Sequence, residues 1–436
     1  MKKQEKKFVL AALALLAITG LLALAGCKND TVPEPTPKYT VSFNTNGGST
    51  VASQTVESGQ KATRPAADPT LEGSWFLGWY SDEGLANEFD FNTPITDATT
   101  VYAKWSYKLH TEPSILTNYT SSHAPEGEWT YVEFGDWPQT ILKDDVEVYE
   151  TKSKEMGMFT YYLGSDGNHY VKAKEKACEV GYKYSDGSEV KQKDESGSPS
   201  TRWFKVEPIV WRVLTEDYKD PDGKSTGNAL LLAEKILTGG IKWADSSNKY
   251  KESYIRQWLN GNSGTGETSD YNGDTGFLQT AFTQSARELI ADTPVDNSAA
   301  STNPASDTQW NDGKNEYASD TPTTDKVFLL SEAEATTGAH LKGLTDEDYG
   351  FDEYSGSGTG NTRIRVTTDY AKATGAYQGD PSAGYGGWWW LRSPSFGSEL
   401  NARGIKDDGD AGNNRNVRNV FNTNEGVVPA LSISLK

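Results

Sequence analysis

The feature that most constrains this chain is its C-terminal segment, where two apolar, strand-prone stretches enclose a polar run. The first stretch is the aromatic cluster WWWLRSP at 388–394, and the second is GVVPAL at 426–431. Between them lie small side chains that donate and accept hydrogen bonds but cannot fill a core. They are Asn401, Asn413, Asn414, Asn416, Asn419, Asn422 and Asn424. A stiff frame that carries polar tips is the arrangement a binding surface requires.

Length and charge restrict the class of protein. With 436 residues the chain exceeds one typical domain, so at least two folded units are expected after removal of any targeting segment. Lysine and arginine number 42 against 61 for aspartate and glutamate, which gives a net charge of -19. Such a surface repels phosphate backbones, so nucleic acid is not expected as a partner.

Residues 1–26 have the pattern of an export signal. A basic start is followed by an apolar run over 8–24, which ends in LAGC at 24–27. This ending resembles the lipobox of bacterial lipoproteins. The resemblance implies cleavage before Cys27 and acylation of Cys27, which would anchor the protein on a membrane without a spanning helix. A plain transmembrane anchor is the alternative.

Catalytic and metal-binding patterns are not found in the sequence. Once Cys27 is acylated, Cys178 has no disulfide partner, and no histidine stands near it in sequence to activate it, so a structural role is expected. The four histidines lack metal-binding spacing, and no Gly-x-Ser-x-Gly elbow occurs. The prediction is therefore a protein that is not an enzyme, with no catalytic residue, no metal and no cofactor.

The N-terminal part predicts a small β module. Residues 27–38 form a proline-rich linker, and residues 39–105 carry the signatures Asn-Gly-Gly at 46–48, Gly-Trp-Tyr at 78–80 and Tyr-Ala-Lys-Trp at 102–105. In this order they resemble the Listeria-Bacteroides repeat, also called the internalin B-type repeat, of bacterial surface proteins. The resemblance implies a β-grasp-like spacer or adhesion element. Trp79 and Trp105 are expected in its core and not on a ligand platform.

A polar linker is expected at 106–128, followed by a larger domain at 129–436. Strands are predicted at 131–139 and 229–234, and 203–214 reads as two strands that meet at Pro208. Apolar residues at helical spacing predict helices at 254–259 and 278–290. The predicted fold class is α+β and β-rich.

Four motifs of the larger domain carry a second resemblance. They occur in the order FGDWPQ at 134–139, EPIVWRVL at 207–214, WWLRSP at 389–394 and GVVPAL at 426–431. This order resembles a C-type-lectin-fold domain of spirochaete and gut bacterial surface proteins. Many relatives have arginine before the final Pro-Ala-Leu, whereas Val428 stands here, so a salt bridge made by that arginine is missing.

Within that family the chain is most similar to variable lipoproteins of the Treponema type, which a diversity-generating retroelement rewrites at asparagine codons. This implies a variable C-terminal region at about 390–431 and a fold that tolerates many side chains on one face. Lys406 fits less well, because an asparagine codon ending in C cannot be rewritten to lysine. The alternative is that the asparagines simply form turns.

The alternation of side chains along a strand predicts which residues of this region point inward and which point outward. Ala402 and Ile405 should point inward and Arg403 and Lys406 outward, with a turn at 408–409. The stretches 388–390 and 427–431 are expected to form central strands. Structural roles are predicted for Trp389, Trp390, Arg392 and Trp211, with Arg392 held by a carboxylate or by carbonyl groups. The predicted ligand-binding residues are Phe396, Leu400, Arg403, Lys406, Asp410, Asn413, Asn414, Asn416, Arg418, Phe421, Asn422 and Asn424.

The expected function follows from these resemblances. They imply an exported lipoprotein, anchored to the cell membrane or outer membrane and exposed on the surface, that binds a protein ligand of another cell or a host surface. A fixed-specificity adhesin or a structural envelope protein is the alternative. An enzyme of the formylglycine-generating type, which shares the fold, is less favoured, because those enzymes have paired active-site cysteines.

Overall fold

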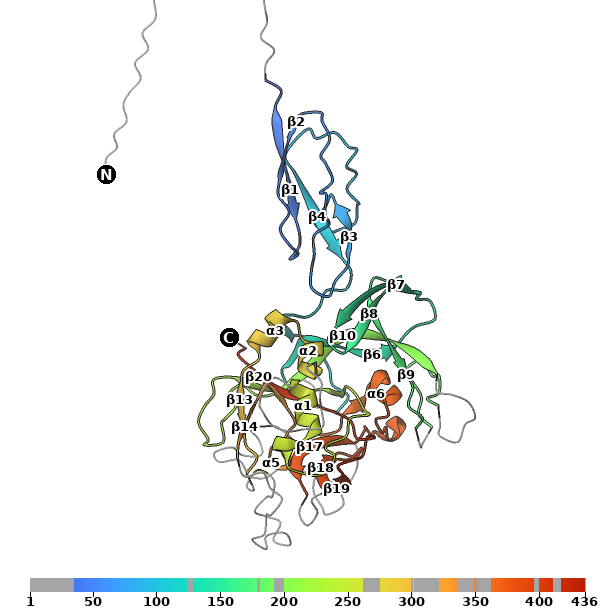
Figure 1. Cartoon of the computed structure of the whole chain (residues 1–436), viewed down its shortest axis with the longest axis vertical. Coiled ribbons are helices and arrows are strands. Elements are labelled where there is room, and N and C mark those ends of the chain that lie inside the picture. Colours follow the sequence, from blue (N-terminus) through green and yellow to red (C-terminus); the bar gives the residue numbers. More distant parts are fainter. Residues whose placement is uncertain are drawn as a thin grey trace, which may run out of the picture.

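The computed structural model describes residues 35–123, 129–178, 181–191, 200–261, 275–298, 301, 321–335, 349, 351, 362–395, 400–410 and 417–435. Within these residues the chain forms a small β unit and a larger β-rich unit with short helices (Figure 1). The β-rich α+β class predicted from the sequence is confirmed.

The small unit is a mixed sheet of four strands in the order β2-β1-β4-β3. Its central pair, β1 and β4, is parallel, and both outer pairs are antiparallel. Trp79 is buried in the core, and Trp105 packs against the same core while its Nε1 donates to the Thr45 oxygen at 2.8 Å. Both tryptophans therefore have the core role predicted for them. The strands are β1 (Lys38–Asn44), β2 (Gln54–Glu57), β3 (Phe76–Tyr80) and β4 (Thr99–Trp105).

A nine-stranded sheet organises the larger unit. Seven strands follow the order β15-β20-β11-β10-β9-β8-β7, while β6 pairs with β10 and with β5. The strands are β5 (Ser114–Leu116), β6 (Tyr131–Ile141), β7 (Val148–Met156), β8 (Phe159–Gly164), β9 (His169–Lys174), β10 (Thr201–Thr215), β11 (Ala229–Ala233), β15 (Val327–Phe328) and β20 (Ala430–Ile433). The predicted strands at 131–139 and 229–234 are confirmed as β6 and β11.

Strand β10 is continuous through Pro208, so the prediction of two strands meeting there is wrong. The register between β10 and β6 shifts between Pro208 and Val210, which marks a bulge. Proline cannot donate to the ladder, and a bulge lets the strand continue past it. Beyond the bulge, Trp211 is fully buried and its Nε1 donates to the Phe134 oxygen at 2.7 Å.

Short helices cover the larger unit, and those predicted at 254–259 and 278–290 are confirmed, the second as two helices. The helices are α1 (Tyr254–Asn260), α2 (Phe277–Ala281), α3 (Gln284–Leu289), α5 (Glu332–Ala335) and α6 (Asp369–Ala373), with the 3-10 turns η1 (Tyr250–Glu252) and η3 (Pro381–Ala383). Two small ladders pair β12 (Lys235–Ile236) with β16 (Val366–Thr367) and β13 (Thr293–Val295) with β14 (Thr323–Asp325).

The two C-terminal stretches that were expected to form central strands lie in different sheets. β20 is an inner strand of the large sheet, between β15 and β11. The aromatic cluster begins β17 (Trp389–Pro394), which is instead an edge strand of a separate sheet with β18 (Asn401–Ile405) and β19 (Val417–Asn419). A single bridge between Trp389 and Gly426 connects the two stretches.

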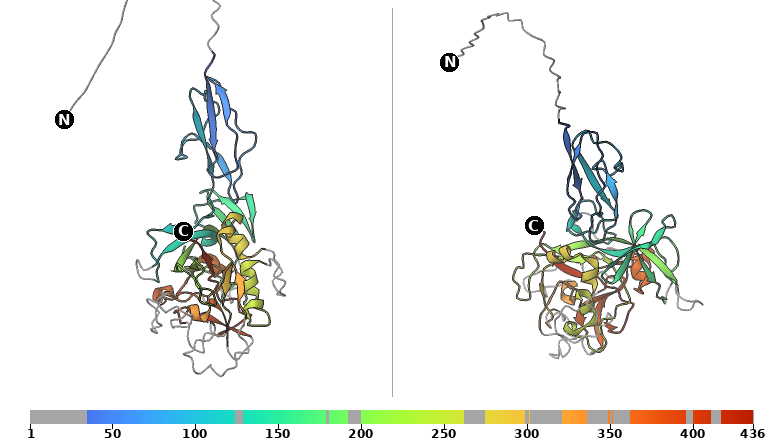
Figure 2. Two further views of the ribbon diagram at one scale, coloured as in Figure 1. Left: turned by 90° about the vertical axis from the view of Figure 1, so that its left-hand side faces the viewer. Right: turned by 45° about the horizontal axis from the view of Figure 1, so that its top comes forward.

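The small unit is seated on one end of the larger unit (Figures 1 and 2). The ring of His169 on β9 packs edge-on against Trp75 at 4.7 Å, and its Nε2 lies 2.8 Å from Ser106 Oγ. Leu109 belongs to the core of the larger unit, and β5 pairs with β6. The described part of the expected linker, residues 106–123, is thus integrated into the larger unit.

Candidate functional site

The C-terminal three-stranded sheet is held in place by buried aromatic and polar groups. Trp389 and Trp390 on β17 are fully buried. Trp243 Nε1 donates to the Leu391 oxygen at 3.0 Å, and Asn248 Nδ2 donates to the Asn401 oxygen at 2.9 Å. These bonds come from residues well over a hundred positions upstream, so the sheet is tied to the body of the larger unit.

Arg392 is an internal residue of this frame. Its Nη1 donates to the Glu334 carboxylate of α5 and to the Leu329 oxygen at 2.8 Å, and its Nη2 donates to the Asp296 oxygen at 2.9 Å. Glu334 accepts a further bond from Ser331 N at 2.7 Å. A carboxylate together with carbonyl groups is the environment predicted for Arg392 from the sequence.

Arg403 does not point outward, and that prediction is wrong. Its Nε lies 3.3 Å from Glu332 Oε2, and the two side chains are only 7% and 6% exposed. The reason is that β18 is the middle strand of its sheet and is buried throughout Ala402–Ile405. Alternation predicts an outward side chain only where one face of a sheet meets solvent.

Asp410 is likewise buried, contrary to its predicted place on an outer face. The chain turns at 406–409, as predicted, with Gly409 N donating to the Lys406 oxygen at 3.0 Å. The turn brings Asp410 back under Lys406, whose Nζ lies 3.3 Å from Asp410 Oδ2. Lys406 remains partly exposed.

A stacked column of side chains stands beside β19. The rings of Tyr377 and Trp388 stack at 4.1 Å, and the guanidinium of Arg418 lies 4.2 Å from the Trp388 ring centre. Arg418 Nε is 3.0 Å from Oε1 of the buried Glu425. Burial raises the pKa of Glu425 to about 7, although Arg418 acts to lower it. Trp388 and Glu425 were not predicted as parts of the site, because no local pattern pairs them with Arg418.

This column cannot serve as a stacking platform for a ligand. Both faces of Trp388 are covered, one by Tyr377 and the other by Arg418. The crevice between Trp388, Arg418 and Glu425 leaves no room even for a water molecule. Arg418, which was predicted as a ligand contact, is paired with the buried Glu425 and lies over the Trp388 ring.

The side chains that do reach solvent lie on and next to β18 and β19. Leu400 is 39% exposed and Phe421 is 47% exposed. Asn419 Oδ1 accepts from Phe421 N at 3.0 Å, which fixes the turn that carries the phenyl ring. We call the following set the C-terminal face: Leu400, Asn419, Phe421, Asn422 and Asn424, of which the last two are partly exposed. The predicted site residues Phe396, Asn413, Asn414 and Asn416 lie outside the described residues.

The strands that carry the C-terminal face lie at the end of the larger unit away from the small unit. In the view of Figure 1, β17, β18 and β19 are at the bottom and the small unit is at the top, and both views of Figure 2 agree. The first described residues, before β1, are at the far end of the small unit. The face therefore lies distal to the N-terminal part of the chain.

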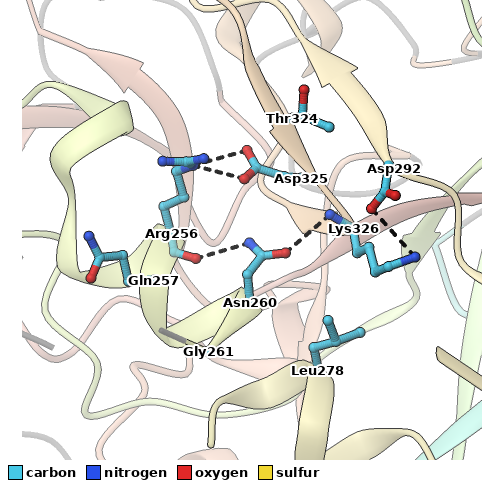
Figure 3. A pocket seen from close by; sticks show the side chains of 9 residues that line it. All are labelled: Arg256, Gln257, Asn260, Gly261, Leu278, Asp292, Thr324, Asp325 and Lys326. Carbon is cyan, nitrogen blue, oxygen red and sulfur yellow. Dashed lines mark hydrogen bonds and ion pairs between the residues drawn. The ribbon is translucent and has the colours of Figure 1, made fainter. Parts of the chain in front are cut away.

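A small pocket of about 130 Å³ opens elsewhere, between α1 and the strands β14 and β15 (Figure 3). Arg256 Nε donates to both oxygens of Asp325, at 2.8 and 3.1 Å. Asn260 Nδ2 donates to the Val327 oxygen at 2.7 Å, and its Oδ1 accepts from Lys326 N at 3.1 Å. These groups join α1 to the strands, so the pocket wall has a structural role.

Within the described residues, no group of three or more potential metal ligands comes together. Cys178 is buried, with Sγ 3.3 Å from the Lys191 oxygen, which fits the structural role predicted for it.

Each helix in the described part of the chain is too short or too polar to traverse a lipid bilayer.

Two families match parts of the chain. Residues 39–104 match the Listeria-Bacteroides repeat domain, which confirms the predicted N-terminal repeat. Residues 226–435 match a domain of unknown function, DUF6273. This second match includes the whole C-terminal sheet.

Two curated proteins of Evansella cellulosilytica are similar to the chain. One, provisionally named a membrane protein, is 29% identical over 240 residues, which cover 50% of this chain and 34% of that protein. Another, provisionally named a Gly-rich membrane protein, is 43% identical over 74 residues, which cover 17% of this chain and 8% of that protein. The matches thus span a minor part of both relatives.

Proposed function

We propose that this chain is a cell-envelope lipoprotein, anchored through Cys27, that binds a protein ligand outside the cell through its C-terminal face. The observation that carries the proposal is the exposure of Phe421 and Leu400 among asparagines, on a sheet fixed by buried ion pairs. Exposed aromatic side chains surrounded by polar groups are typical anchors of protein interfaces. A fixed frame lowers the entropy lost on binding.

The place of the protein in the envelope rests on three separate features. The lipobox-like LAGC ends at Cys27. The repeat at 39–104 is of a type that occurs in bacterial surface proteins. Both relatives carry names that describe membrane proteins. An anchor at Cys27 would leave the C-terminal face at the end remote from the membrane, where a partner can reach it.

A binding role is favoured over catalysis, and a C-type-lectin-type fold for 129–436 is part of the proposal. The competing formylglycine-generating type of enzyme requires paired cysteines. The chain has two cysteines, of which Cys27 lies in the lipobox and Cys178 is buried against the Lys191 oxygen. Neither is placed as an exposed nucleophile of the larger unit.

Diversification of the C-terminal face is a further part of the proposal. The burial of Arg403 and Asp410 removes them from the positions that could be rewritten freely. Leu400, Phe421, Asn422 and the other face residues remain, since exposed positions tolerate most side chains. A reverse transcriptase gene with an adenine-rich near-copy of the codons for 390–431 would support this. Without them, a fixed-specificity adhesin is the better description.

Binding is tested with cells that display the full chain. The probes are intact host or bacterial cells and immobilised extracellular-matrix proteins. We expect the triple variant Leu400→Ser, Phe421→Ser, Asn422→Ala to lose at least about tenfold in binding, as for loss of interface anchors. The matched control replaces exposed apolar residues far from the face, Leu77→Ser and Ile115→Ser, which are 40% and 57% exposed. Equal binding by the triple variant and wild type would refute a role of the face.

The anchor is tested separately. Cys27→Ser should move the protein from the membrane fraction to the soluble fraction, because acylation requires the thiol. Cys178→Ser is the matched control and should stay with the membrane. If both variants remain membrane-bound, the apolar run at 8–24 is sufficient to hold the protein on the membrane, and the role of the face stands.

A further inference from the structure

Two buried arginines converge on one carbonyl group in the larger unit. Arg212 lies on β10, and Arg365 lies in the loop just before β16. Nη1 of each donates to the Thr362 oxygen at 2.8 Å. Both side chains are fully buried. Two guanidinium groups that share an acceptor repel each other, and burial strengthens this repulsion.

The charge of one carboxylate, that of Glu234, acts on both arginines, but its hydrogen bonds go to Arg212. Both oxygens of Glu234 bond to Arg212, with Nε–Oε2 at 2.9 Å and Nη2–Oε1 at 2.7 Å. Arg365 bonds to carbonyl groups alone: besides that of Thr362, those of Ala233 at 3.1 Å and Ile364 at 3.0 Å. In the part of the chain that the structure describes, no carboxylate pairs with Arg365. Two positive charges therefore face one negative charge.

Unused donors accompany the unbalanced charge. Nη2 of Arg365 is buried and has no hydrogen-bond partner among the described residues, and the same holds for Nε1 of Trp129. The indole of Trp129 belongs to the same cluster, since the Arg212 guanidinium lies 4.9 Å from its ring centre. Buried donors without acceptors are rare in proteins because each costs free energy.

We propose that a small monovalent anion, such as chloride or formate, binds beside Arg365. An anion both balances the second arginine and accepts from its unused Nη2, whereas a water molecule would accept from this group without balancing the charge. Burial and the neighbouring Arg212 lower the pKa of Arg365 to about 9, so its charge persists at neutral pH. The site does not depend on the proposed binding function.

The test is thermal unfolding of the purified full chain at constant ionic strength. Sodium gluconate, whose anion is too large for a buried site, is replaced stepwise by sodium chloride or sodium formate. We expect Tm to rise by about 2–4 °C, since an anion that binds only the folded state stabilises it by mass action. A rise with chloride alone identifies a halide site, and a rise with both identifies a general small-anion site.

Variants separate this site from general salt effects. Arg365→Gln should remove the anion-dependent rise. Arg256→Gln is the matched control, because Arg256 is also buried but has Asp325 as its carboxylate partner at 2.8 Å, and this variant should keep the rise. If Arg365→Gln does not fold, wild-type crystals soaked in sodium bromide should show anomalous density beside Arg365 Nη2.

Three results would overturn the proposal. Tm could be the same in gluconate, chloride and formate, or the rise could persist in Arg365→Gln, or the bromide crystals could lack density at Arg365.

Discussion

Arg403 and Glu332 form an ion pair in the interior, with 3.3 Å between Nε and Oε2 and only 7% and 6% of their side chains exposed. Glu332 belongs to α5, the same short helix whose Glu334 pairs with Arg392 of β17. One turn of helix thus supplies the counter-charges for two neighbouring strands. The residues that would contact a ligand and those that fix the sheet are therefore different sets.

Replacement of Arg403 should lower the stability of the fold, whatever its effect on recognition at the surface. We expect Arg403→Ala to lower the free energy of unfolding by about 3 kcal/mol, because it leaves a buried carboxylate without its arginine. Phe421→Ala, at a side chain 47% exposed, should change it by less than about 0.5 kcal/mol. Urea unfolding followed by tryptophan fluorescence measures both. The prediction fails if the two variants are equally stable.

A compensated variant checks the cause of this effect. Replacing both charges, as in Arg403→Met with Glu332→Leu, should recover most of the stability that Arg403→Ala loses, since a buried ion pair and a well-packed apolar pair of similar volume are close in free energy. A double variant as unstable as Arg403→Ala would mean that other contacts of the arginine dominate.

Features of the fold that are set by neighbouring residues could be predicted from the sequence. Features that are set by contacts between distant residues could not. Helix α1 was predictable because its apolar residues recur at helical spacing along the chain itself. The continuity of β10 through Pro208 was not, because the bulge depends on its pairing with β6. The orientation of Arg403 could not be read from alternation, since α5, which supplies its partner, lies about seventy positions away in the sequence. The exposure of Phe421 agreed with expectation because it lies in a turn.

Glu425 should make stability depend on pH. Burial raises its pKa to about 7, despite Arg418, above the ordinary glutamate pKa of 4.5. Between these two values the folded state binds more protons than the unfolded state, so stability falls as the pH rises from 4.5 to 7. Glu425→Gln should remove this decline and make the protein more stable than wild type at pH 7.5 by up to about 3 kcal/mol. Measurement of Tm for wild type and Glu425→Gln across this pH range checks the prediction. Parallel curves of Tm against pH would contradict it.

His169 should act with the opposite sign at the junction of the two units. Burial, with a smaller effect of Lys154, lowers its pKa to about 3 from 6.5. The folded state therefore resists protonation, and stability is lost as the pH falls below 6.5. Between pH 7 and 5 wild type should lose up to about 2 kcal/mol more than His169→Gln, which can still bond Ser106. Urea unfolding at the two pH values measures the difference.

His110 offers a control for this experiment. Burial acts to lower its pKa, but the hydrogen bond and charge of Asp136, with Glu133, raise it overall. Its stabilising effect is thus present below pH 6.5 and is lost as the pH rises through its folded pKa. Relative to His110→Gln, wild type should therefore become more stable as the pH falls from 7 to 5. The same sign for both histidines would show that a general charge effect, and not the local contacts, governs the pH dependence.

Gly135, in the FGDWPQ motif, should tolerate no side chain. Its φ is +72°, and a Cβ there would lie 2.4 Å from Cε1 of Phe282 and 2.9 Å from the Ala281 oxygen at the end of α2. Gly59 has a similar φ of +83° but nothing within 4 Å of a Cβ. Gly59→Ala should therefore show only the cost of a left-handed residue, about 1–2 kcal/mol, whereas Gly135→Ala adds overpacking of about 1–3 kcal/mol against α2. Equal losses of stability in urea unfolding would mean that α2 moves aside without cost, and that the motif does not fix the helix on β6.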